Sequence, residues 1–138
     1  MFFTKFIYCY KQLKDINFDS LFILGKYTDY FTALEASLKL REITYHNISA
    51  LPSGELKHGT LALIDNNSTC IIIATNMDTL DKNINSIHEI KARGGKVILV
   101  TQFDVSIDVY HIIKLPNIND DLIDIISIIP FQLLALER

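Results

Sequence analysis

Short apolar runs alternate along this chain with stretches in which apolar residues recur at helical spacing. The runs cover residues 21–24, 71–74, 97–100 and 110–115. A continuous apolar run of this length is typical of a strand buried on both faces, as in a parallel sheet. The pattern therefore predicts four interior strands.

Helical spacing covers the intervening stretches, at residues 2–16, 29–45 and 78–93 and from Asp120 or Asp121 towards the end of the chain. Asp78 is the predicted N-cap of the third helix, Gly94 and Gly95 form its C-cap, and Pro130 is expected to kink the last helix. Because right-handed crossovers place helices on both faces of a parallel sheet, the sequence predicts an α/β fold, a three-layer α/β/α sandwich. Ligands of such folds bind beyond the carboxyl ends of the strands.

Length and composition indicate one globular domain. The chain has 138 residues, 49% of them hydrophobic and 21% charged, with a formal net charge of −3. The basic residues are scattered, so we expect no nucleic-acid partner. The most apolar stretch, residues 122–136, is shorter than the roughly 20 residues that cross a bilayer, so we expect no membrane partner. Cys9 and Cys70 form no C-x-x-C motif, and together with the missing secretory signal this indicates a soluble protein of a reducing, cytoplasmic setting.

Two groups of ionisable residues are candidates for chemistry, since the common nucleotide, hydrolase and zinc motifs are missing from the sequence. Glu35, Lys39, Glu42 and His46 recur at i, i+4, i+7 and i+11, which puts them on one face of the predicted second helix. By spacing alone they form either part of a site or a solvent-facing Glu–Lys pair.

The second group lies in a short segment between two glycines. Glu55, Lys57 and His58 stand between Gly54 and Gly59. Spacing leaves open whether this segment is functional or a polar surface turn.

Longer motifs around both groups carry a family resemblance. Residues 34–45, L-E-A-S-L-K-L-R-E-I-T-Y, resemble A-L-E-G-A-L-K-L-K-E-I-S-Y of the glutamine–fructose-6-phosphate transaminases (isomerising), the glucosamine-6-phosphate synthases. Residues 54–64, G-E-L-K-H-G-T-L-A-L-I, are similar to the family's G-E-L-K-H-G-P-L-A-L-I. A-R-G-G at residues 92–95 and P-F-Q-L-L-A at residues 130–135 match the family's A-R-G-G and P-L-Q-L-L-A.

The resemblance implies that residues 1–138 form a single subdomain, the second sugar-isomerase (SIS) subdomain of the family's isomerase domain. The family enzyme converts fructose 6-phosphate and glutamine into glucosamine 6-phosphate and glutamate, without a metal or organic cofactor. Glu42 matches its isomerisation base, Lys39 a lysine beside that base, and His58 the histidine that assists ring opening from the neighbouring subunit. Glu35 and Lys57 are the candidate substrate-binding residues.

Parts of the family enzyme have no match here: the glutaminase domain, the first SIS subdomain and the tail that bears the Schiff-base lysine. Ser49 also replaces a family glutamate, and Thr60 a proline. We therefore expect a phosphosugar-binding subdomain that acts as a homodimer or with a complementing chain, and no complete synthase activity from this chain alone. The alternatives are a non-enzymatic, phosphosugar-binding regulatory module and a degenerate fragment that serves only assembly.

Overall fold

The computed structural model describes residue 13 and residues 16–136, apart from the side chains of residues 120 and 121. The helix expected over residues 2–16 lies almost entirely outside the described residues.

A parallel sheet forms the centre of the molecule. The described residues contain five strands, β1 Leu21–Gly25, β2 Ser49–Pro52, β3 Thr69–Ala74, β4 Lys96–Thr101 and β5 His111–Lys114. Their order in the sheet is β2-β1-β3-β4-β5, and every neighbouring pair is parallel. The four strands predicted from apolar runs are confirmed. The short edge strand β2 was not predicted.

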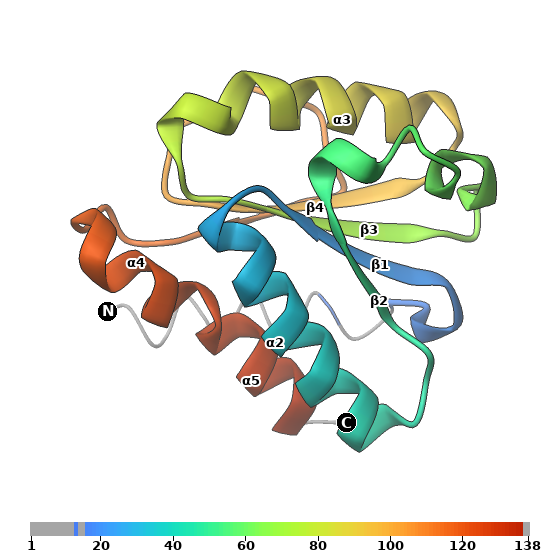
Figure 1. Cartoon of the computed structure of the whole chain (residues 1–138), viewed down its shortest axis with the longest axis horizontal. Helices are drawn as coiled ribbons and strands as arrows, with labels where there is room; N and C mark the ends of the chain where they lie inside the picture. The colour runs from blue at the N-terminus through green and yellow to red at the C-terminus, as the bar shows by residue number, and fades with distance from the viewer. Residues whose placement is uncertain (1–12, 14–15, 137–138) are drawn as a thin grey trace.

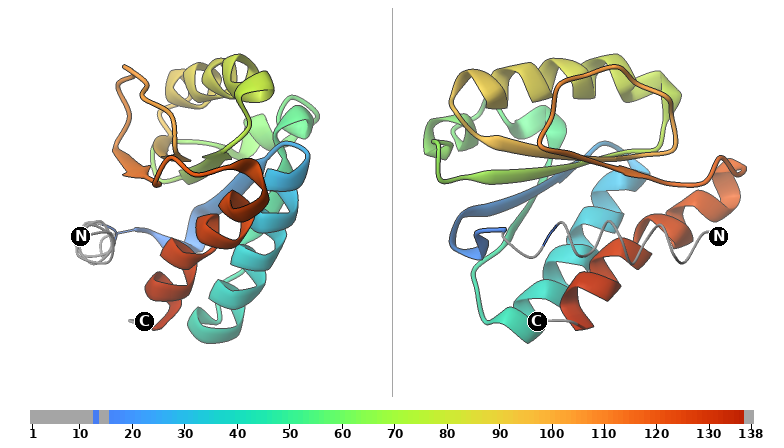
Figure 2. Two further views of the ribbon diagram at one scale, coloured as in Figure 1. Left: turned by 90° about the vertical axis from the view of Figure 1, so that its left-hand side faces the viewer. Right: turned by 180° about the vertical axis from the view of Figure 1, so that it is seen from behind.

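Helices cover both faces of this sheet (Figures 1 and 2). The α-helices of the described part are α2 Thr28–Thr44, α3 Leu80–Ala92, α4 Asp120–Ser127 and α5 Ile129–Leu136. Short 3-10 turns are η1 Phe18–Ser20, η2 Ser53–Glu55, η3 Thr60–Leu63 and η4 Met77–Thr79. α3 lies on one face, and α2, α4 and α5 lie on the other, which confirms the predicted three-layer sandwich. Within the described residues, no helix is both long enough and apolar enough to cross a membrane.

Successive side chains of the central strands point to opposite faces of the sheet, where they pack into two separate apolar cores. Ile71 and Ile73 of β3 belong to the core on the side of α2 and α5. Cys70 and Ile72 belong to the core on the side of α3. Cys70 is fully buried, and burial raises the pKa of its thiol to about 12, so it serves as a small apolar side chain there.

The ends of the helices confirm some of the predicted caps and correct others. At the end of α3, Gly94 has a φ of 85° and donates its N–H to Lys91 O at 2.9 Å, and Gly95 N–H bonds to Ile90 O at 3.1 Å, so the predicted glycine C-cap is confirmed. The prediction of Asp78 as N-cap was wrong, because it lies inside η4, where Asn76 supplies the capping oxygen.

The last helix also begins differently from the prediction. Asn119 is the N-cap of α4, without a side-chain capping bond, so Asp120 is the first helical residue and not the cap. α4 ends at Ser127 and α5 begins at Ile129. The break comes just before Pro130, as expected from the missing N–H of that residue.

The passage from β1 into α2 is tightly packed. A Cβ atom placed on Gly25 would lie 2.4 Å from the backbone carbonyl carbon and oxygen of Asp29, closer than atoms can approach. Tyr27, in the segment that joins Gly25 to Asp29, has a φ of 53°, which is unusual for a residue other than glycine. The absence of a side chain at residue 25 therefore sets how closely α2 begins against the sheet.

We expect Gly25→Ala to lower the free energy of unfolding by about 2 kcal/mol or more, because the added methyl group forces the start of α2 away from β1. Gly54→Ala is the matched control, since the nearest atom to its added Cβ would be Lys26 Nζ at 3.9 Å. Urea unfolding of both variants measures the effect. Equal stability of the two variants would show that the close approach is unimportant.

Candidate functional site

The stripe of ionisable residues on α2 is exposed to solvent. Lys39 Nζ lies 3.8 Å from Glu35 Oε1, and both side chains are about half exposed, at 42% and 50%. Glu42 is exposed in the last turn of the helix. Lys39 and Glu35 form the solvent-facing i, i+4 contact that the spacing allows. In this structure Lys39 therefore lies against Glu35 and not against Glu42.

His46, the fourth member of the predicted stripe, lies outside the helix and makes its contacts with residues of η1. Its Nδ1 lies 2.8 Å from Asp19 Oδ1, and its ring stacks on Phe18 with centroids 6.0 Å apart. His46 therefore ties the end of α2 to η1 and does not extend the stripe.

The turn between Gly54 and Gly59 presents its charged residues at the surface. Glu55, Lys57 and His58 are all exposed, and Lys57 Nζ forms an ion pair with Glu89 Oε1 of α3 at 3.0 Å. Gly59 has a φ of 119°, a conformation that favours glycine. Lys57 thus faces α3, on the opposite side of the sheet from α2.

Within one chain, Glu42 and His58 are not brought together. α2 ends at Thr44, shortly before β2 begins, and the turn that carries His58 follows the other end of β2. Figures 1 and 2 both show the end of α2 far from the turn that follows β2, which lies beside α3.

A buried carboxylate that the sequence analysis missed lies at the carboxyl ends of the central strands. Asp29, in the first turn of α2, is fully buried and accepts a hydrogen bond from Thr75 N–H at 2.9 Å and a second, shorter one from Thr75 Oγ1. Burial raises the pKa of Asp29 to about 6, although the hydrogen bonds from Thr75 act in the opposite direction. The partners are 46 residues apart, so nothing in the local sequence pattern predicts their contact.

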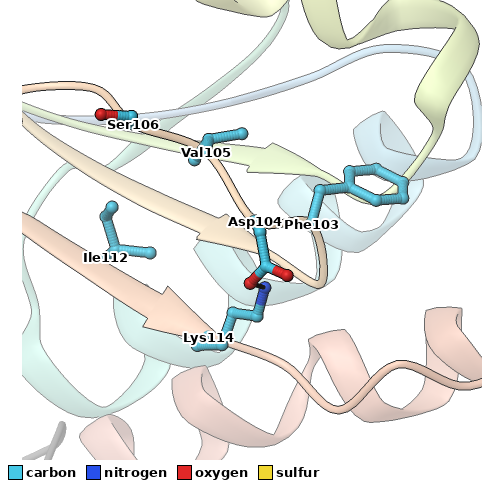
Figure 3. Close-up of a pocket in the computed structure, with 6 residues that line it drawn as sticks. All are labelled: Phe103, Asp104, Val105, Ser106, Ile112 and Lys114. Atoms are coloured by element: carbon cyan, nitrogen blue, oxygen red, sulfur yellow. Dashed lines mark hydrogen bonds and ion pairs between the residues drawn. The ribbon is translucent and has the colours of Figure 1, made fainter.

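Among the hollows of the described surface are the following three. One is lined by Phe103, Asp104, Val105, Ser106, Ile112 and Lys114, with an ion pair between Lys114 and Asp104 at 2.6 Å (Figure 3). A second is lined by Lys91, Gly95, Lys96, Val97, Asp108, Val109 and Tyr110. The third lies between the turn after β2 and α3, and its lining is Lys26, Ser53, Gly54, Leu56, Lys57, Lys82, Asn85, Ser86 and Glu89. No group of three His, Cys, Asp or Glu side chains suited to a metal ion occurs among the described residues.

α2 also exposes a line of large apolar side chains. Its members within the helix are Phe31, Leu34 and Leu38, with Phe31 69% exposed. Their spacing places them along one side of the helix. An exposed apolar line on a helix that also carries charged candidate residues is typical of a surface that another domain covers.

Comparison with known proteins identifies relatives over most of the chain. The sequence model of the SIS domain family matches residues 16–137. The glutamine–fructose-6-phosphate aminotransferase (isomerizing) of Caldanaerobacter subterraneus subsp. tengcongensis is 40% identical over 122 residues, which cover 86% of this chain and 20% of that protein. The aminotransferase of the same name from Escherichia coli K12 is 43% identical over 115 residues, which cover 81% of this chain and 19% of that protein.

The fold has a close counterpart among solved structures. The C-terminal domain of glucosamine-fructose-6-phosphate aminotransferase from Francisella tularensis superposes with a TM-score of 0.83 and 35% sequence identity, covering 96% of this chain and 38% of that one. The chain thus spans about a fifth of the length of the curated relatives described above.

The ionisation of Asp29 makes a testable contribution to stability. The folded chain holds this proton up to about pH 6, whereas an unfolded aspartate releases it near pH 3.8. The contribution of Asp29 to the free energy of unfolding therefore falls as the pH rises between these values, by about 3 kcal/mol in total. Because asparagine does not titrate, Asp29→Asn removes this pH-dependent contribution to the free energy of unfolding. We expect the stability of this variant relative to the parent chain to rise by up to that amount between about pH 4 and about pH 7.

Urea unfolding at several pH values measures this difference. The matched control is Asp81→Asn, which makes the same substitution on the exposed surface of α3 and leaves the buried pair of Asp29 and Thr75 intact. A flat difference for Asp29→Asn would contradict the raised pKa.

Proposed function

The chain belongs to the SIS domain family, and on that premise we propose that it is the isomerase-type subdomain of a glutamine–fructose-6-phosphate aminotransferase. It binds a phosphosugar, fructose 6-phosphate or glucosamine 6-phosphate, and contributes part of the machinery that converts one into the other. In this proposal the protein acts in the cytoplasm.

One observation carries this proposal: Glu42 and His58 both occur, exposed, within motifs that this chain shares with the aminotransferases. A module that only binds a phosphosugar has no use for a base at residue 42. The non-enzymatic and degenerate alternatives draw no such support, and the relatives described above are aminotransferases, not regulators.

The chemistry assigned to Glu42 is the transfer of one proton. Interconversion of a ketose and an aldose removes a proton from C1 and returns it to C2, through an enediol-type intermediate whose oxygens carry negative charge. An ionised carboxylate on a solvent-facing helix is free to approach a bound sugar from one side. Glu42 performs both transfers, and His58 exchanges the hydroxyl proton that moves when the sugar ring opens.

The nearby charged residues position the ligand in this proposal. Lys39 lies one helical turn before Glu42, where its ammonium group stabilises the oxyanion that develops on the sugar. The contact of Lys39 with Glu35, 3.8 Å long and half exposed, is weak enough for an anionic ligand to replace. Lys57 binds substrate after release from Glu89.

The separation of Glu42 and His58 argues for a site shared between chains. In one chain they lie near opposite ends of β2, so the His58 that meets a given Glu42 comes from a neighbour. The apolar line on α2 is the surface that we assign to such an assembly.

A chimera tests the role of Glu42. Residues 16–137 replace the corresponding segment of the Escherichia coli aminotransferase, which supplies the other domains. We expect the chimera to form glucosamine 6-phosphate, and Glu42→Gln to lower kcat by at least about 100-fold because the proton acceptor is lost. Asp81→Asn, which changes an exposed carboxylate on α3 outside the proposed site, is the control and should change kcat only slightly.

An active Glu42→Gln chimera would exclude this carboxylate as the base. The 138-residue chain alone, incubated with fructose 6-phosphate and glutamine, is expected to form no glucosamine 6-phosphate.

Self-association tests the assembly surface. Light scattering of the concentrated chain should give a mass above the 15.8 kDa of the monomer. Leu38→Ser on α2 should shift the population towards the monomer, because it removes apolar surface from the proposed interface. Leu63→Ser, which changes an exposed leucine on η3, is the control. A strictly monomeric parent chain would contradict a site completed by a second copy.

A further inference from the structure

A slot opens between β5 and the segment that leads into it from β4. That segment, residues 103–109, contains neither helix nor strand and forms a strap beside β5. Figure 3 shows the residues that line the slot, which come from the strap and from β5: Phe103, Asp104, Val105, Ser106, Ile112 and Lys114. The strap follows the carboxyl end of β4, and Lys114 is the last residue of β5. The slot therefore lies at the edge of the sheet where ligands of open parallel folds bind.

Apolar side chains form the inner part of this slot. Val105 of the strap and Ile112 of β5 are half-buried, and both pack against the apolar core on the side of α3. The volume of the slot is about 360 Å³, within the range of roughly 300–1,000 Å³ that is typical of small-molecule sites. The slot therefore has room for a short apolar chain.

An exposed ion pair crosses the slot from β5 to the strap. Lys114 Nζ donates a hydrogen bond to Asp104 Oδ1 at 2.6 Å (Figure 3). This hydrogen bond and the charge of Lys114 hold the pKa of Asp104 below its ordinary value, so both partners are ionised. The Lys114 side chain is 44% exposed and that of Asp104 is fully exposed. Because exposed ion pairs of this kind contribute little, another carboxylate can replace Asp104 on Lys114 at small cost.

The ion pair at the other end of the strap is harder to replace. Lys91 Nζ donates to the backbone oxygen of Asp108 as well as to its carboxylate, which lies 3.3 Å away. A backbone oxygen cannot rotate into solvent unless the strap itself moves. Lys114, by contrast, is bonded to a side chain that can turn into water without a change in the strap.

The charge of the slot selects a singly charged anion. It holds one ammonium group and one carboxylate, so a doubly charged phosphate group on Lys114 would lie beside the negative charge of Asp104. We propose that this slot binds a small organic carboxylate with a short apolar chain. The carboxylate of the ligand takes the place of Asp104 on Lys114, and its chain lies against Val105 and Ile112.

This site goes beyond the proposed function, because it requires neither Glu42 nor a second chain. The sheet order is β2-β1-β3-β4-β5, so the slot lies at the edge of the sheet opposite to β2 and the turn that carries His58. Exchange of one carboxylate for another contributes little free energy, so the affinity comes mainly from burial of the apolar chain. We therefore expect binding at millimolar concentration.

NMR titration of the isotope-labelled full chain, followed through its backbone amide shifts, tests the proposal. The probe is isocaproate, and its shifts should concentrate on the strap and β5. Acetate has the carboxylate without the chain, and isohexyl alcohol has the chain without the charge. Each should bind at least about tenfold more weakly than isocaproate, because each lacks one of the two contacts.

Leucine has the carbon skeleton of isocaproate with an added ammonium group, and it distinguishes two sources of the ligand. Tighter binding of leucine identifies an amino acid, whose ammonium group meets the freed Asp104. Equal or tighter binding of isocaproate identifies a simple carboxylic acid. Both results support the slot.

The two members of the ion pair should have opposite effects on isocaproate binding. Lys114→Gln should weaken it at least about fivefold, because the cation that holds the carboxylate is lost. Asp104→Asn should tighten it about threefold, because the competing carboxylate is lost. General damage to the fold would not produce opposite signs. Lys91→Gln and Asp108→Asn make the same changes at the other end of the strap and should leave the affinity within about twofold of the parent chain.

Three results would overturn the proposal: no amide shifts with millimolar isocaproate, equal affinity for acetate or inorganic phosphate, or weaker isocaproate binding by Asp104→Asn. Equal affinity for those small anions would indicate an adventitious ion on Lys114 only. Glu42→Gln separates this site from the proposed function, since it should leave isocaproate binding unchanged even where it abolishes isomerisation.

Discussion

The hydrogen bonds between Asp29 and Thr75 fix the helix on which the proposed chemistry depends. They join the first turn of α2 to the end of β3, across the point where the chain order in the sheet reverses direction. Gly25 allows the same helix to begin in contact with β1. Because α2 is one continuous helix of 17 residues, its start determines where Glu35, Lys39 and Glu42 lie relative to the sheet. The cost of burying the Asp29 carboxylate is visible in its raised pKa.

The strands inside the sheet were predictable, and the strand at its edge was not. β3 is recognisable as a strand because all six of its residues are buried and the five from Cys70 to Ala74 form a continuous apolar run. β2 has only four residues, all half-buried, and ends in a proline, so it shows neither a continuous apolar run nor clear alternation. Its position depends on pairing with β1, which is a long-range property that local patterns do not carry.

The candidate site residues, like the strands, were predictable from the sequence only in part. Spacing placed Glu35, Lys39 and Glu42 on one helix face, but it could not separate a site from a surface ion pair, and only the family resemblance gave Glu42 and His58 roles. The contact of Lys57 with Glu89 arises where the turn after β2 meets α3. Such convergence depends on the crossovers of the fold and has no signature in sequence spacing.

The face of α2 combines exposed carboxylates with exposed apolar residues, as expected for a site that another subunit completes.

A crystal structure of the assembled protein with fructose 6-phosphate bound tests the central claim most directly. The account predicts that the Glu42 carboxylate lies about 3–3.5 Å from C1 or C2 of the sugar, with His58 of a neighbouring chain at the ring oxygen. A sugar bound away from α2, with Glu42 facing solvent in every chain of the assembly, would contradict it.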